Sequence, residues 1–249
     1  MKHLIATSVL AFALAACSND AEVEEDTDLA AETEEDEVAS EAIPFTDFAD
    51  LDLGAKIVGP QGDEVISRFS NETGAFADVR SYVACPAGMD PCDPATAPEG
   101  TVYTYVHVVY PGEDNDPESG SGAGDDSSNV ETTESFRMTM ASHGFTGTAG
   151  FSRAEAVNAL GDVGTIVINC HENGIDWTVE EGDGGEQWGQ AEPITFFWQS
   201  TLPPAGPQNA YEVFANYTAA GGEGPHPENR DGVSNACARG APLDRSTDG

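Results

Sequence analysis

Beyond Ile43, apolar and polar residues alternate with a period of two, and this alternation constrains the fold more than any other feature. The firmest segments run from Phe76 to Ala84, from Thr101 to Tyr110 and from Pro193 to Thr201. Each is bounded by Gly, Pro, Asn or Asp, the residues that form turns. Successive side chains of a strand point to opposite faces, so the pattern predicts strands with one buried face.

A second signal is the dipeptide Asn173-Gly174 between two short apolar segments. Asn-Gly favours a two-residue type I′ turn, which predicts a β-hairpin in which Cys170 lies opposite Trp177. On the other face of this hairpin His171 becomes a neighbour of Asp176. The only convincing helix begins at Ser152, which forms a capping box with Glu155.

About eight strands and one short helix, separated by turn residues, predict an all-β fold. We expect a single β-sandwich domain over residues 43–249 with Greek-key or jelly-roll connections. The tail after Gly221 has no clear alternation and is predicted to be irregular.

The N-terminus predicts export. Lys2 precedes an apolar run from Leu4 to Ala16 that fits a secretory signal and is too short to span a bilayer. The run ends in Leu14-Ala15-Ala16-Cys17, which resembles the lipobox of bacterial lipoproteins. That resemblance implies removal of residues 1–16, lipidation of Cys17 and membrane attachment through the lipid. With Ser18 after the anchor, it also implies the outer membrane, facing either the periplasm or the cell surface.

The chain is strongly acidic, with a formal net charge of -36. Twelve Asp or Glu and no Lys or Arg occur in residues 20–42, so residues 17–42 are predicted to form a lipidated N-terminus and a disordered acidic linker. Residues 43–249 carry 33 acidic and 8 basic side chains. This charge repels polyanions and argues against a nucleic-acid partner.

Four cysteines remain after the lipidated one, and an even number in an exported chain predicts disulfides. The turn residues between Cys85 and Cys92 favour a bond within that loop, which leaves Cys170 to pair with Cys237. Structural zinc is the alternative, but the cysteines lack the close Cys-x-x-Cys spacing of such sites.

An acidic stretch among Gly and Ser residues is a candidate calcium loop. Calcium prefers six to eight hard oxygen ligands, although the stretch does not match the EF-hand register and also fits a solvated loop. Its candidate ligands are Asp114, Asp116, Glu118, Asp125 and Asp126.

Aromatic residues supply a candidate ligand-binding surface. Tyr103, Tyr105 and His107 share one face of a predicted strand whose other face is aliphatic, so an exposed aromatic face could stack against sugars. A half-buried strand face accounts for the same pattern. Trp188, in a Gly-rich segment, is predicted to be solvent-accessible, whereas Trp177 and Trp198 are expected in the core.

No motif of a nucleophilic hydrolase, zinc protease or phosphate-binding loop is present. The sequence therefore favours a lipid-anchored envelope or surface protein with a non-enzymatic binding or structural role, for which a glycan or a protein is a candidate partner. Two alternatives stay open. One is a calcium-dependent carbohydrate-binding or adhesion module, and the other is an extracytoplasmic hydrolase that uses paired carboxylates.

Overall fold

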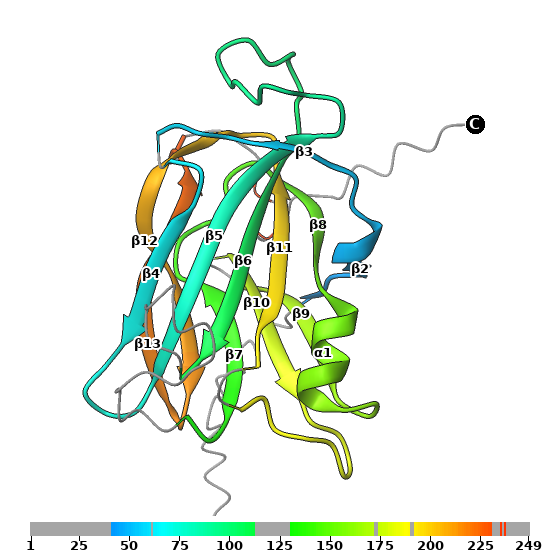
Figure 1. Cartoon of the computed structure of the whole chain (residues 1–249), viewed down its shortest axis with the longest axis vertical. Coiled ribbons are helices and arrows are strands. Elements are labelled where there is room, and N and C mark those ends of the chain that lie inside the picture. Colours follow the sequence, from blue (N-terminus) through cyan, green and yellow to red (C-terminus); the bar gives the residue numbers. More distant parts are fainter. Residues whose placement is uncertain are drawn as a thin grey trace, which may run out of the picture. The chain divides into compact units, whose positions relative to one another are not determined.

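The computed structural model describes residues 41–60, 62–112, 130–171, 174–189 and 192–230, together with residues 235 and 237. They belong to one compact unit, Ala39–Gly249. Thirteen strands in the described residues form two sheets that face each other, which confirms the predicted all-β sandwich (Figure 1). The strand count exceeds the prediction because several short edge strands have no alternation to detect.

Sheet A has six strands. Their spatial order is β1 (Glu41–Ala42), β9 (Thr165–His171), β10 (Gly174–Glu180), β7 (Thr133–Met138), β12 (Pro204–Ala215) and β13 (Thr218–Pro227).

Sheet B has seven strands. The order is β2 (Phe45–Asp47), β8 (Phe145–Phe151), β11 (Ile194–Ser200), β6 (Tyr103–Pro111), β5 (Phe76–Pro86) and β3 (Leu53–Lys56), with β4 (Val65–Ser70) also pairing with β5. All pairings are antiparallel except that of β2 with β8. The short helix η1 (Phe48–Asp50) follows β2.

Large aromatic side chains fill the space between the sheets. Phe136 and Trp177 of sheet A pack against Phe196 of sheet B, with ring centroids 5.4 and 5.8 Å from it. The indole nitrogen of Trp177 donates a hydrogen bond to the carbonyl oxygen of Gly150, 3.1 Å away on the opposite sheet. Trp177 and Trp198 are fully buried, as predicted.

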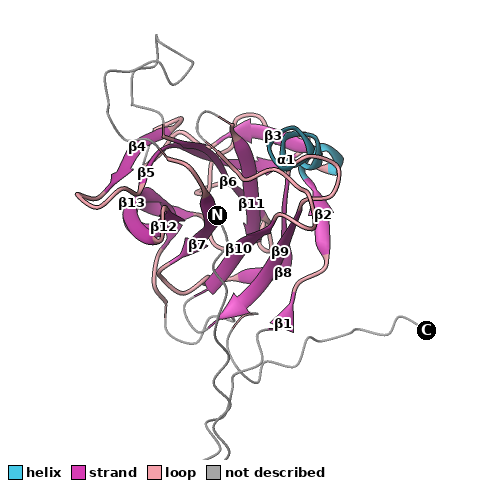
Figure 2. Cartoon of the chain, turned by 90° about the horizontal axis from the view of Figure 1, so that it is seen from below, coloured by secondary structure: helices cyan, strands magenta, loops and turns pink. Residues whose placement is uncertain are grey.

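The helix α1 (Arg153–Leu160) lies at one side of the layers, next to β2 (Figure 2). Ser152 caps it by accepting a hydrogen bond from the Glu155 backbone N–H, as the sequence predicts. The Glu155 carboxylate does not complete a capping box. It accepts a hydrogen bond of 2.7 Å from the backbone N–H of Thr195, and so ties the helix to β11.

The edge strand of sheet A at the other side of the sandwich is β13. It runs to Pro227, so the prediction of an irregular tail after Gly221 is wrong. This strand contains Gly222 and Gly224, so it shows no alternating pattern. Both glycines allow close packing, because a Cβ at Gly222 would overlap the Phe69 ring and one at Gly224 would come within 2.8 Å of the Tyr211 ring. The backbone N–H of Glu223 also donates to the hydroxyl of Ser67 on β4, 3.2 Å away.

The hairpin of β9 and β10 is present, but its predicted register is wrong by two residues. Gly174 pairs with His171 inside the ladder, so Cys170 lies opposite Ile175 rather than Trp177. The connection is formed by residues 172–173, whose placement lies outside the described residues. A shift of two preserves the face of every side chain, so Cys170 and Trp177 still share the core face.

Candidate functional site

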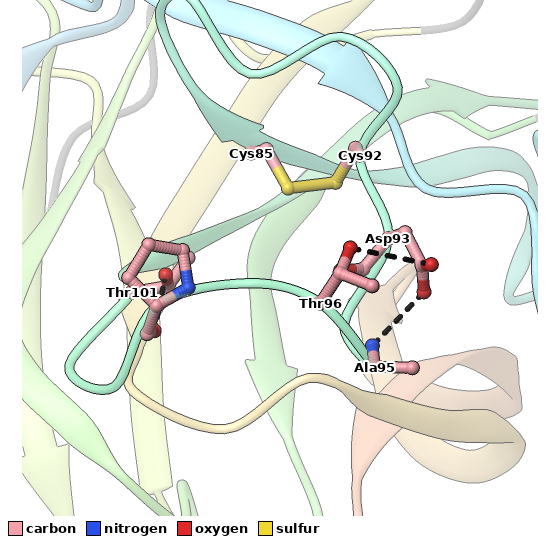
Figure 3. The surroundings of a disulfide bond; sticks show 7 residues. Cys85, Cys92, Asp93, Ala95, Thr96 and Thr101 are labelled. Atoms are coloured by element: carbon pink, nitrogen blue, oxygen red, sulfur yellow. Dashed lines mark hydrogen bonds between the residues drawn. A yellow bond between two sulfur atoms is a disulfide. The ribbon is translucent and has the colours of Figure 1, made fainter.

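Both predicted disulfides are present. Cys85 and Cys92 close a loop of sequence separation 7 at the end of β5 (Figure 3). Beyond Cys92, the Asp93 carboxylate accepts a hydrogen bond from the backbone N–H of Ala95, 2.9 Å away. The hydroxyl of Thr101 donates to the carbonyl oxygen of Pro98 over 2.7 Å, just before β6. The connection between β5 and β6 is therefore held by a disulfide in its first part and by hydrogen bonds in its second.

The second disulfide joins Cys170 on β9 to Cys237, across a sequence separation of 67. Cys237 is buried, with 7 % of its surface exposed. This bond fixes a residue ten positions beyond the end of β13 to the opposite part of sheet A. With both bonds formed, the four cysteines that follow Cys17 are all paired.

The predicted aromatic surface on β6 does not exist as an exposed face. Tyr103, Tyr105 and His107 point into the core, where Tyr105 and His107 have no exposed surface. The Tyr105 ring stacks on Trp198 at 4.5 Å, and its hydroxyl donates to the carbonyl oxygen of Leu202. The prediction of exposure is wrong because β6 is a central strand whose larger side chains fill the space between the sheets.

Trp188 is also buried, contrary to the prediction that its ring is accessible to solvent. Its indole nitrogen donates to the carbonyl oxygen of Glu192, 2.6 Å away, and its ring meets Phe196 edge-on at 5.6 Å. Its own carbonyl oxygen accepts a hydrogen bond from Thr133 at the start of β7. The Gly-rich segment thus folds back onto the sandwich instead of projecting from it.

A row of charged side chains lies on the outer face of sheet A. Arg137 on β7 pairs across strands with Asp176 on β10 at one side and with Glu212 on β12 at the other. Residues paired in this way lie on the same face of a sheet. The guanidinium of Arg137 forms an ion pair with the Glu212 carboxylate. We call these three residues and His171 the charged row.

Asp176 differs from the many solvated carboxylates of this chain. Burial raises its pKa above the ordinary value, and the nearby Glu212 adds to this effect. His171, Arg137 and a hydrogen bond from Thr178 favour the charged form and offset part of the increase. At Asp176 the effect of burial therefore outweighs the neighbouring positive charges.

Two carboxylates with unlike environments can exchange protons with a bound polar ligand. Asp176 and Glu212 are two strands apart, so their backbones are about 10 Å from each other. Inverting glycosidases hold their two carboxyl groups about 6.5–9.5 Å apart. Arg137 lies on the strand between the two acids and is paired with both in register, an arrangement that also suits hydrogen bonding without catalysis.

Sequence reasoning anticipated only part of the charged row. His171 and Asp176 were expected to be neighbours, and the pKa of Asp176 does depend on His171. Arg137 and Glu212 were missed, because the pairing of β7 with β10 and β12 joins segments far apart in the chain. For Arg137 the sequence does hold one indication, because it alternates with the apolar Phe136 and Met138 and so belongs to an outer strand face.

The lipidation site Cys17 and the candidate calcium ligands lie outside the described residues. Those calcium ligands are Asp114, Asp116, Glu118, Asp125 and Asp126. Within the described ranges, no three His, Cys, Asp or Glu side chains are grouped so that they could hold a metal ion. No helix in the same ranges is long and apolar enough to cross a membrane.

No family model, curated protein or solved structure matches this chain.

Proposed function

We propose that this chain is a lipid-anchored extracytoplasmic protein of the cell envelope, with a non-enzymatic binding or structural role. The pairing of all four cysteines that follow Cys17 is the observation that carries the proposal, because such bonds form and persist in oxidising compartments. The lipobox-like segment ending at Cys17 supports the same placement. The proposed anchor is a lipid, and the sandwich is the part that meets a partner.

Membrane fractionation of the full chain and its Cys17→Ser variant tests the anchor. The wild type is expected in the membrane fraction with a lipid label, and the variant in the soluble fraction without one. A lipid-labelled, membrane-bound Cys17→Ser product would contradict the proposal. Thiol titration of the purified protein under denaturing conditions is a separate check, and more than one reactive thiol per chain would contradict the oxidised state.

A second candidate function is glycoside hydrolysis, favoured by the raised pKa of Asp176 and by Glu212 two strands away. In this scheme protonated Asp176 donates a proton to the leaving oxygen while the Glu212 carboxylate activates water. The ion pair of Glu212 with Arg137 weighs against it, because the guanidinium already contacts the carboxylate oxygen Oε1, which this scheme needs for the water.

Asp176→Asn and Glu212→Gln test this second candidate against a panel of neutral polysaccharides, with release of reducing ends as the measurement. Hydrolysis that both variants abolish, and that Thr139→Ala on the same face leaves unchanged, would establish the enzyme. Thr139 is an exposed residue beyond the end of β7 and serves as the matched control. Absence of hydrolysis by the wild-type chain would exclude the enzyme for those substrates.

A further inference from the structure

The turn between β12 and β13 carries an unusual pair of residues. Ala215 pairs with Thr218, so Asn216 and Tyr217 form a two-residue hairpin loop. Both have positive φ, +49° for Asn216 and +62° for Tyr217, as a type I′ turn requires. Asn is common in such turns and Gly usually follows it, whereas a bulky aromatic residue at positive φ is a true outlier.

The turn is fixed by its neighbours on both sides. The Asn216 side-chain oxygen accepts a hydrogen bond of 2.9 Å from the backbone N–H of Glu131, and its amide nitrogen donates to the carbonyl oxygen of Gly74, 3.1 Å away. The hydroxyl groups of Thr73 and Thr218 lie 3.0 Å apart. The loops before β5 and before β7 therefore clamp the hairpin from two directions.

The side chain of Tyr217, carried on this fixed turn, projects into solvent. Tyr217 is 84 % exposed, the highest value among the large hydrophobic side chains of the described residues. A buried aromatic ring could repay an unfavourable backbone conformation through packing, but an exposed one gains little. Packing of the Tyr217 ring in the fold therefore does not offset its backbone strain.

We infer that Tyr217 is a preformed stacking contact for a neutral carbohydrate. This inference rests on the proposed binding role and gives it a site and a ligand class. A tyrosine ring offers an apolar face for a sugar ring, and a backbone already fixed beneath it lowers the entropy that binding would otherwise cost.

The surroundings of the turn favour a neutral sugar. They hold the hydroxyl groups of Thr73 and Thr218, which hydrogen-bond to each other and to the Asn71 side chain, and the Glu134 carboxylate, which accepts a hydrogen bond from the Tyr217 backbone N–H. Such groups match sugar hydroxyls better than they match an apolar surface. A net charge of -36 disfavours acidic polysaccharides and other polyanions.

The test measures binding of the full chain in detergent to cellohexaose and chitohexaose by calorimetry, with polygalacturonate as the anionic comparison. Tyr217→Phe keeps the ring and is expected to bind a neutral oligosaccharide within about threefold of the wild type. Tyr217→Gly is expected to bind at least about tenfold more weakly. Because Gly tolerates positive φ, the same variant is expected to melt roughly 2–4 °C higher. Val58→Ala, at another exposed apolar side chain, is the control and should bind like the wild type.

Equal binding by wild type and Tyr217→Gly would overturn the role of Tyr217. So would binding of polygalacturonate as tight as that of the neutral sugars, or no binding of either neutral oligosaccharide at millimolar concentration. Fractionation of the same variants examines the lipid anchor independently. If the anchor assignment fails, the calorimetric result still shows whether Tyr217 binds sugar. If sugar binding fails, the chain can still be a lipid-anchored binding protein, but Tyr217 is not its binding site.

Discussion

His107 of sheet B and His226 of sheet A both meet the ring of Tyr211, with centroids 4.2 and 6.3 Å from it. Neither imidazole has exposed surface. His107 Nδ1 lies 2.9 Å from the Ser81 hydroxyl, and His226 Nδ1 lies 2.9 Å from the carbonyl oxygen of Pro227. Burial lowers the pKa of His107 to about 3 and that of His226 to about 4.

These histidines predict that the protein loses stability in mild acid. In the unfolded chain both protonate near the ordinary pKa of 6.5, so between pH 6.5 and 4 the unfolded state binds more protons than the folded one. Above pH 6.5 both are neutral in either state and have no effect, and below it each destabilises the fold by about 1.4 kcal/mol per pH unit down to its folded-state pKa. Urea unfolding at pH 7.5, 6.5, 5.5 and 4.5 measures this slope.

The slope can be assigned with His226→Phe, which removes one titrating group and should reduce it between pH 6.5 and 4.5. Tyr211→Phe is the control, because it removes the hydroxyl that donates to the Pro225 carbonyl oxygen but no group that titrates in this range. It should lower stability equally at every pH. An unchanged slope in His226→Phe would contradict the assignment.

The sandwich itself could be predicted because central strands keep a strict alternation. The predicted segments beginning at Phe76, Thr101 and Pro193 correspond to β5, β6 and β11, which form the middle of sheet B. What alternation did not give was the direction of the faces. On β6 the alternation assigned the side chains to the two faces correctly, but the aromatic face is the buried one. Large rings fill the space between the two sheets better than aliphatic side chains do.

The last strand shows a different limit of sequence reasoning. Gly222 and Gly224 carry no side chain, so no period can be detected across β13. They are required by long-range contacts with Phe69 and Tyr211, which no local pattern reveals. The charged row was hidden for the same reason, since Arg137 and Glu212 meet only through strand pairing.

Within the charged row, Arg137→Leu and Asp176→Asn are expected to act in opposite directions. Arg137→Leu leaves the Glu212 carboxylate, whose side chain is 17 % exposed, without its cation and should cost about 1–3 kcal/mol. Asp176→Asn should leave stability at pH 7 unchanged or raise it, because burial disfavours the Asp176 charge and raises its pKa. This advantage should shrink as the pH falls through the raised pKa of Asp176 and disappear below its ordinary value of 3.8, where the carboxyl is neutral in both states.

Urea unfolding of the two variants at pH 7 and pH 4 decides the point. If Asp176→Asn is destabilised at pH 7 as much as Arg137→Leu, the Asp176 carboxylate forms a stabilising ion pair and the expected cost of its burial is contradicted.

The two disulfides should contribute unequally to stability. In the chain-entropy model, removing the Cys170–Cys237 bond costs roughly 4 kcal/mol and removing Cys85–Cys92 roughly 2 kcal/mol, because their sequence separations are 67 and 7. Paired Cys→Ala variants compared by thermal unfolding test this order. A larger loss from the Cys85–Cys92 pair would show that the hydrogen-bonded loop beyond Cys92 depends on the bond more than chain entropy does.

The close approach of β13 to the core predicts that Gly222→Ala is severely destabilising. The new Cβ would fall on the ring of Phe69, which is fully buried and cannot move freely, so we expect a loss of about 3 kcal/mol. Gly59→Ala is the control, because a Cβ there meets no atom within 4 Å. In the double variant Gly222→Ala/Phe69→Leu, the smaller side chain makes room for the methyl group, so its cost should be less than the sum of the single costs. Additive losses in urea unfolding would mean that the methyl group and the Phe69 ring do not compete for the same space.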